Sequence, residues 1–181
     1  MRKRIRIGMA CFLAISFFNC NVLSYAYTKT GYKFDEPRKI KFFIASNASA
    51  YARMFRNTVP TWGSYVTQVS LKETVAERDG NIKLYYGTTG RSVYGVTVRI
   101  DRNHYKITFT EYFAKLSTNN KKREVILHEV GHALGLDHTQ KGNYGVSIMW
   151  NGEDGNHFHN VAYPLSDDVR GMTSIYSNYS K

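Results

Sequence analysis

The chain lacks a hydrophobic run long enough to cross a membrane. Its longest uncharged, mainly apolar stretch, Ile7 to Phe18, falls short of the roughly 20 residues that a spanning helix needs. Basic residues precede this stretch, and the small residues of Ser24-Tyr25-Ala26 follow it. This order is typical of a secretory signal peptide, so we predict that residues 1–26 are removed. Two alternatives to a cleaved signal peptide remain open: a short membrane anchor, and a lipoprotein with a lipid attached at Cys20.

Cysteine is scarce: the chain has only two, Cys11 and Cys20, and both precede the predicted cleavage site. The mature chain is therefore expected to contain no thiols and no disulfides. A domain of about 155 residues can fold on its hydrophobic core alone. An exported protein without disulfides is more typical of bacteria than of animals.

Acidic residues are few, with 14 Asp and Glu against 25 Lys and Arg among 181 residues. Removing the four basic residues of the predicted signal leaves 21 Lys and Arg against 14 acids, a formal charge of +7. These charges are dispersed, which favours simple solubility over a specific anionic partner. The 14 Tyr are scattered through predicted strands rather than grouped in a nucleic-acid-binding motif. We expect a monomeric, secreted, extracellular protein that binds no nucleic acid and is not stably associated with a membrane.

In the first two thirds of the mature chain, the sequence pattern predicts five strands, with one helix between the first strand and the second. The predicted strands span 39–45, 65–71, 82–86, 93–100 and 104–110, the last two forming a hairpin. Asn47 or Ser49 is expected to cap the helix, and Pro60 to end it near Val59. The sequence shows no internal repeat and no second domain, so residues 27–181 are predicted to form one domain.

Three imidazoles and a carboxylate lie within the eleven residues 128–138 (HEVGHALGLDH). On a helix predicted over 121–134, His128 and His132 are four residues apart and project from the same face. Gly135 can adopt positive φ and end the helix, which would bring His138 round as a third nitrogen. Three protein ligands leave a fourth position open, which is typical of a catalytic rather than a structural zinc.

Glu129 follows the first of these histidines and leans over the same site without being needed as a ligand. Zinc would lower the pKa of a bound water towards about 7, and Glu129 could accept the proton from it. Asp137 is expected to be a supporting or surface residue. Met149, in Ser147-Ile148-Met149, is expected in a tight turn beneath the metal. A last helix is predicted from an N-cap at Ser166 to about Tyr176.

HEVGHALGLDH followed by Ser147-Ile148-Met149 resembles the metzincin metalloproteases. Thr139 and the segment Pro164-Leu165-Ser166-Asp167-Asp168 are similar to the matrixin branch. The resemblance implies an α+β, zincin-like fold, with a five-stranded twisted mixed sheet, two main helices on one side and a C-terminal helix. It implies a zinc endopeptidase acting on protein or peptide substrates, with Glu129 as general base and Met149 in the Met-turn. The implied zinc ligands are His128, His132 and His138.

The resemblance also implies that the fourth strand is an antiparallel edge to which a substrate adds as a further strand. The residues of that edge are Val93, Tyr94, Gly95, Val96 and Thr97. Family features that are missing include a cysteine-bearing propeptide and the acidic, glycine-rich loop that holds calcium, so a Ca²⁺ site is not supported. Glu153 is an alternative third ligand, and His157 and His159 are expected to be exposed to solvent. A catalytically silent binding protein on the same fold is the alternative of a different class.

Overall fold

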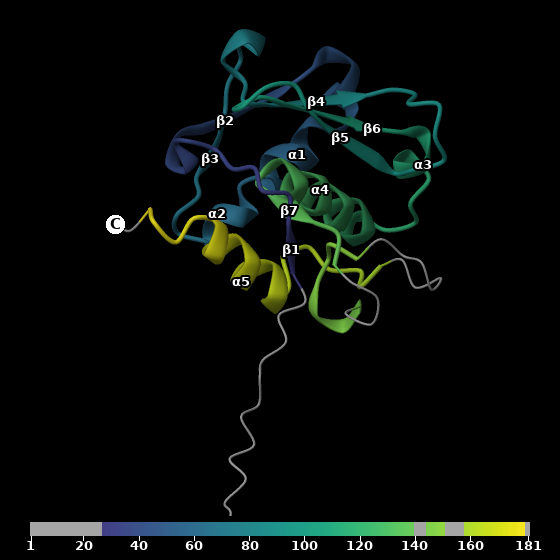
Figure 1. The fold of residues 1–181 in the computed structure, drawn as a ribbon. Helices are drawn as coiled ribbons and strands as arrows, with labels where there is room; N and C mark the ends of the chain where they lie inside the picture. Colours follow the sequence, from purple (N-terminus) through teal and green to yellow (C-terminus); the bar gives the residue numbers. More distant parts are fainter. Residues whose placement is uncertain (1–26, 140–143, 151–157, 180–181) are drawn as a thin grey trace, which may run out of the picture.

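The computed structural model describes residues 27–139, 144–150 and 158–179, and the predicted signal peptide lies outside them. These residues form an α+β fold in which helices cover a five-stranded sheet (Figure 1). The fold class predicted from the sequence is therefore confirmed. Among the described residues, no helix has both the length and the apolarity that crossing a membrane requires.

The five-stranded sheet has the order β3-β2-β4-β6-β5. Its strands are β2 (Ile40–Ile44), β3 (Leu71–Glu73), β4 (Ile82–Tyr86), β5 (Gly95–Arg99) and β6 (Tyr105–Phe109). Strands β3, β2, β4 and β6 are parallel, whereas β5 runs antiparallel to β6. The predicted antiparallel edge strand is confirmed, although Val93 and Tyr94 precede it.

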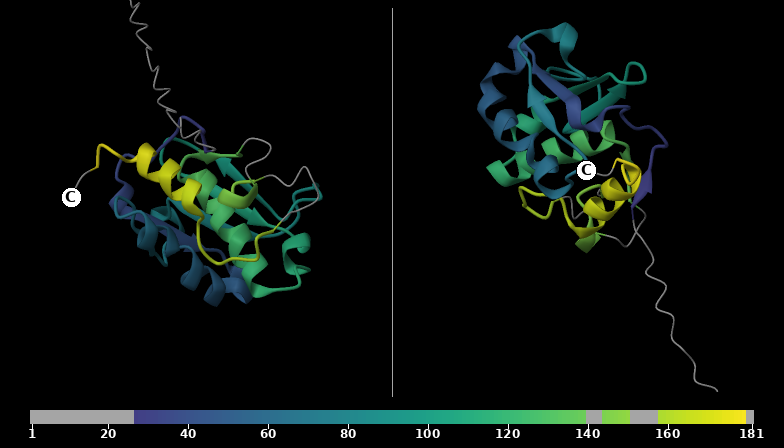
Figure 2. Two further views of the ribbon diagram at one scale, coloured as in Figure 1. Left: turned by 90° about the horizontal axis from the view of Figure 1, so that it is seen from below. Right: turned by 90° about the vertical axis from the view of Figure 1, so that its left-hand side faces the viewer.

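One face of this sheet supplies the core. On β4 and β6, residues Ile82, Leu84, Ile107 and Phe109 are fully buried, whereas the residues between them are more exposed. This alternation is what a sheet with one covered face requires. The covering helices are α1 (Ala52–Thr58), α2 (Thr61–Tyr65) and α4 (Asn119–Ala133). Figure 2 shows them on the same side of the sheet.

Helix α4 runs through the centre of the molecule. The Thr118 hydroxyl caps its first turn by accepting a hydrogen bond from the Lys121 N–H at 3.2 Å. Its buried face includes Ile126, Leu127 and Val130. The buried indole of Trp62, on α2, donates to the Leu127 carbonyl at 3.1 Å, so the two helices are joined by a satisfied polar contact as well as by packing.

Strands β1 (Thr28–Lys29) and β7 (Leu136–Asp137) and helix α5 (Ser166–Ile175) pack together on the side of α4 that faces away from the sheet (Figure 1). Strand β1 pairs antiparallel with β7, directly after α4. Helix α5 lies beside them. The buried Tyr176 hydroxyl donates to the Leu134 carbonyl at 3.0 Å and accepts from the Phe34 N–H at 3.2 Å. These contacts fix the chain around the end of α4. Short elements complete the structure: η1 (Pro37–Lys39), η2 (Ser46–Tyr51), η3 (Glu77–Asp79), α3 (Glu111–Ala114) and η4 (Tyr144–Val146).

The strand predicted over 65–71 is wrong. Tyr65 ends α2, and β3 begins only at Leu71. Between them, Val66 N–H bonds to Trp62 O at 2.9 Å and Val69 N–H bonds to Val66 O at 3.0 Å. Val66 and Val69 are both buried, and their three-residue spacing suits a turn rather than a strand, in which residues two apart share a face.

Two predicted helix caps are also wrong. Neither Asn47 nor Ser49 caps α1, since the 3₁₀ segment η2 precedes that helix and its N-cap position is Tyr51. The helix does end at Thr58, before Pro60, as predicted. At α5 the N-cap is Leu165 and Ser166 is the first helical residue, because the Asp168 carboxylate reaches back to the Leu165 N–H at 2.7 Å.

Candidate metal centre

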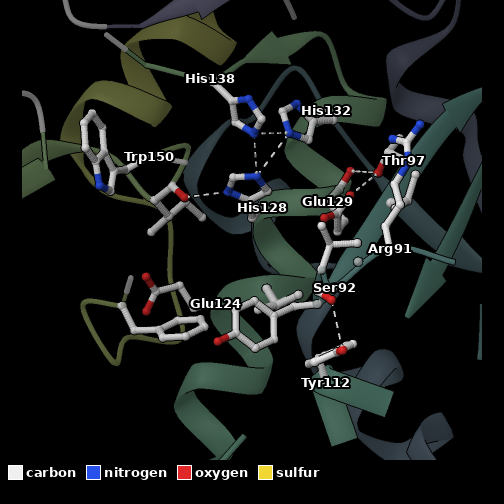
Figure 3. Close-up of a pocket in the computed structure, with 17 residues that line it drawn as sticks. Arg91, Ser92, Thr97, Tyr112, Glu124, His128, Glu129, His132, His138 and Trp150 are labelled. Atoms are coloured by element: carbon white, nitrogen blue, oxygen red, sulfur yellow. Dashed lines mark hydrogen bonds between the residues drawn. The ribbon is translucent and has the colours of Figure 1, made fainter. Parts of the chain in front are cut away.

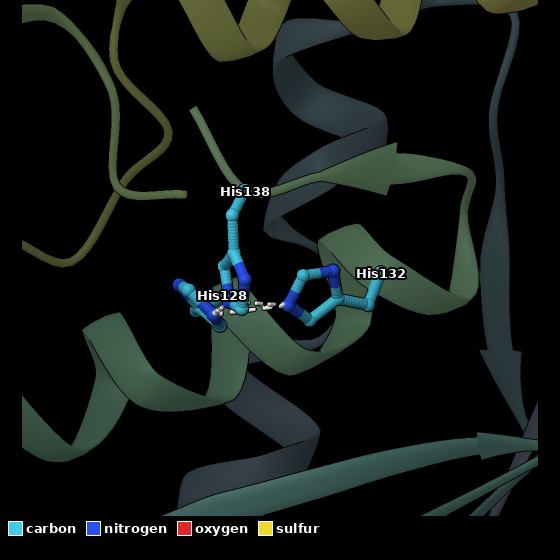
Figure 4. Close-up of side chains that lie close together, drawn as sticks. All are labelled: His128, His132 and His138. Carbon is cyan, nitrogen blue, oxygen red and sulfur yellow. Dashed lines mark hydrogen bonds between the residues drawn. The ribbon is translucent and has the colours of Figure 1, made fainter. Parts of the chain in front are cut away.

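The three histidines of the sequence motif converge at one point. Their Nε2 atoms form a nearly equilateral triangle, with separations of 3.1 Å between His128 and His132 and 3.2 Å from each to His138 (Figure 4). A tetrahedral zinc with Zn–N bonds of 2.0–2.1 Å requires nitrogens about 3.3–3.4 Å apart. The triangle therefore fits a single zinc ion. Among the described residues, these three histidines form the group of side chains that could hold a metal.

Backbone carbonyls orient two of the rings. His128 Nδ1 lies 2.7 Å from the Ile148 carbonyl, and His132 Nδ1 lies 2.9 Å from the Leu136 carbonyl. A carbonyl accepts only, so each Nδ1 carries the proton and each Nε2 presents a lone pair. Burial lowers the pKa of both rings to about 4, which keeps them neutral. Lone pairs that face one another at this distance repel unless a cation lies between them.

The turn at Gly135 brings His138 to the other two rings. Gly135 has a φ of +108°, and a Cβ at this position would collide with the Tyr32 carbonyl oxygen. Glycine is thus required twice over, for the backbone angle and for the close approach. After it, β7 leads directly to His138, whose N–H is held by the Asp137 carboxylate at 2.8 Å. Asp137 was predicted to be a supporting or a surface residue, and its carboxylate binds the main chain beside the ring.

Glu129 lies next to the histidines, with only 6% of its surface exposed. The Thr97 hydroxyl, on β5, is 2.6 Å from Glu129 Oε2 (Figure 3). Burial raises the pKa of the Glu129 carboxyl, opposed by the nearby His132 and by the Thr97 hydrogen bond. A carboxylate so placed can exchange a proton with a molecule held between it and a metal.

The histidines open onto a hollow of about 580 Å³ between β5 and α4. All five residues predicted for the substrate edge line it, including Val93 and Tyr94. Ile148, Trp150 and Phe158 also line it, and the ring centroids of Tyr94 and Phe158 are 5.2 Å apart, in an edge-to-face contact. The hollow is large enough for side chains of a bound peptide beside the metal position.

Met149 packs against α4 at Gly131. It is 1% exposed, and its main-chain carbonyl accepts from the Thr139 N–H at 3.1 Å. A Cβ on Gly131 would come within 2.7 Å of the Met149 sulfur, so the methionine packs where the helix has no side chain. The preceding residue, Ile148, supplies the carbonyl that orients His128. The turn thus supports the metal centre from below.

Asp168 holds that turn, a role that the sequence reading missed. Its carboxylate accepts from Ser147 Oγ at 2.5 Å, from the Ile148 N–H at 3.0 Å and from the Leu165 N–H at 2.7 Å. Burial raises the pKa of Asp168 to about 6 despite these hydrogen bonds. In sequence, two acids at a helix start indicate only dipole stabilisation. Ser147 is buried and lies 21 residues before Asp168 in the sequence. No local sequence pattern therefore indicates that the two side chains are in contact.

Asp168→Ala is expected to lower the free energy of unfolding by about 3–5 kcal/mol, because it strands buried donors of Ser147, Ile148 and Leu165. Chemical denaturation measures this change. Ser166→Ala, two residues earlier, is the matched control and should change stability by less than about 0.5 kcal/mol, since its exposed hydroxyl makes no cap bond. Equal effects of the two substitutions would contradict the assigned role of Asp168.

Glu124 is a second residue that sequence reasoning missed. It lies on α4 one turn before His128, is 4% exposed and lines the hollow. Its carboxylate accepts from the His159 N–H at 3.0 Å and from the Val161 N–H at 3.2 Å, and it lies 3.0 Å from His159 Nδ1. The expected exposure of His159 is therefore wrong, because its side chain is 12% exposed and paired. Glu153 and His157 lie outside the described residues.

The chain is similar to known proteins in motif and in fold. The family model for Matrixin matches residues 96–177, from β5 to just past α5. Among solved structures, myroilysin superposes with a TM-score of 0.59 at 14% identity, covering 80% of this chain and 95% of its own. A chain of a structure described as the GM1-bound form of the ECX AB5 holotoxin gives 0.53 at 16%, covering 76% and 79%. No curated protein matches the sequence significantly.

Proposed function

We propose that this chain is a matrixin-like metzincin, a secreted, zinc-dependent endopeptidase that hydrolyses peptide bonds in proteins. The observation that carries the proposal is the triangle of Nε2 atoms with Glu129 beside it, at the edge of a hollow. Three converging imidazoles and an adjacent buried carboxylate are what metal-assisted hydrolysis needs. Secretion is supported by the predicted signal peptide of residues 1–26.

The site residues of this chain would have separate roles in the proposed reaction. His128, His132 and His138 would hold zinc through Nε2. When bound, zinc would polarise the scissile carbonyl and lower the pKa of a water molecule, which becomes nucleophilic as it loses its proton. Glu129 would accept the proton of the attacking water and pass it to the departing amine. Because Glu129 is buried, few bulk water molecules would reach its carboxylate and compete for that proton.

Strand β5 would bind the substrate backbone. It is hydrogen-bonded to β6 on one side, and in the described part of the chain no strand pairs with its other side. A peptide can add there as a further strand, held by main-chain hydrogen bonds. Its side chains would then meet the walls of the hollow, including Tyr94 and Phe158.

The convergence of three rings supports His138 over Glu153 as the third ligand, because the His138 Nε2 already lies equally far from the other two. The same geometry argues against a silent binding protein, since burying Glu129 beside three converging imidazoles has no benefit without a cation and a reaction.

The mature protein is expected to bind about one zinc ion per chain and to degrade an unfolded protein such as casein. A strong chelator should remove both the zinc and the activity, and added zinc should restore them together. Metal analysis and a fluorescent casein assay on the same samples measure this. Activity that survives complete removal of zinc would contradict the proposal, and an inhibitor of serine proteases serves as the negative control.

A further inference from the structure

The inner face of β5 contacts Glu129 through two residues, Gly95 and Thr97, which are two apart and therefore point the same way. A Cβ on Gly95 would lie 2.7 Å from Glu129 Cγ and 2.8 Å from Oε1. On the other side, the Thr97 hydroxyl lies 2.6 Å from Oε2 (Figure 3). The carboxylate is thus enclosed between a bare backbone and a hydroxyl.

The Thr97 hydroxyl has one proton and two acceptors within reach, Glu129 Oε2 at 2.6 Å and the Glu129 carbonyl at 2.9 Å. A length of 2.6 Å is that of a charge-assisted O–H···O⁻ bond, the stronger of the two choices. The Thr97 hydroxyl therefore donates its proton to the Glu129 carboxylate rather than to the Glu129 carbonyl. This bond occupies Oε2, and the described residues offer no hydrogen-bond partner to Oε1.

We propose that Thr97 is the positioning residue of Glu129: its hydroxyl holds Oε2 so that Oε1 is the oxygen that receives the proton. The inference rests on the proposed function and assigns to the edge strand a second task besides binding substrate. A glutamate side chain has three rotatable bonds, and fixing it beforehand removes a reorganisation cost from each turnover. Gly95 contributes by leaving room for the carboxylate in this one orientation.

Thr97→Val removes the hydroxyl and keeps the shape, whereas Thr97→Ser keeps the hydroxyl and removes a methyl group. With zinc-loaded protein, we expect Thr97→Val to lower kcat about tenfold or more, with KM within about twofold and zinc content unchanged. Thr97→Ser should keep most of the wild-type kcat. Thr108→Val, the same replacement on β6, is the matched control and should leave kcat unchanged.

Crystal structures of the wild type and the two Thr97 variants give a readout that does not depend on activity. Glu129 should adopt one conformation in the wild type and in Thr97→Ser, and several in Thr97→Val. A single unchanged conformation in Thr97→Val would overturn the proposal, and so would a kcat that falls equally in both variants. The two proposals can also be separated. If neither the wild type nor any variant cleaves casein, the proposed function is wrong. If Glu129 still adopts several conformations only in Thr97→Val, the positioning role of Thr97 is supported even so.

Discussion

Replacing Glu129 by alanine is expected to abolish measurable proteolysis while the protein still binds about one zinc ion. The reason is that the proposed zinc ligands are the three imidazole Nε2 atoms, and Glu129 is not one of them. The carboxylate would instead supply proton transfer, a contribution of roughly 10²–10⁴ in rate for a positioned acid–base group. Casein hydrolysis and metal content, measured on the same preparation, separate the two roles.

The control for this experiment is Glu36→Ala. Glu36 is a surface carboxylate paired with the exposed Lys39, so its loss should change neither activity nor zinc content. Glu129→Gln tests the charge alone, because the amide fills the space beside Gly95 and cannot act as a base. Proteolysis that persists in both Glu129 variants would show that another group moves the proton, and the mechanism above would be wrong.

The sheet could be predicted from sequence wherever strands bury one face. In β4 and β6 the apolar residues alternate, and their bounds were found within one residue at each end. The prediction was wrong at residues 65–71, where apolar side chains and β-branched residues imitate a strand. There the packing of Val66 and Val69 determines the backbone: a hydrogen-bonded turn after α2 places both side chains in the core.

The triangle of His128, His132 and His138 could be predicted because the residues that determine it are close in sequence. His128, His132 and Gly135 lie in a single stretch, where helix periodicity and one positive φ determine the geometry. The supporting contacts are not local. Thr97 reaches Glu129 across 32 residues, and Glu124 reaches His159 across 35. No periodicity links such pairs, so only the folded structure could assign them.

Removing the third imidazole is the other change with a large expected effect. His138→Ala should weaken zinc binding by more than about 100-fold, because it would delete a direct ligand, whereas losing an outer contact already costs about 10–100-fold. His138 is exposed and follows β7, so the substitution should leave the thermal stability of the metal-free protein nearly unchanged.

Competition with a chromogenic chelator measures the zinc affinity, and His104→Ala provides the matched control. His104 lies on the turn after β5, 2.8 Å from Asp101, so its loss should leave the affinity as in the wild type. An unchanged affinity in His138→Ala would instead favour Glu153 as the third ligand, and Glu153→Ala would then have to weaken binding. If neither substitution weakens it, zinc is held elsewhere and the triangle of His128, His132 and His138 is not the metal site.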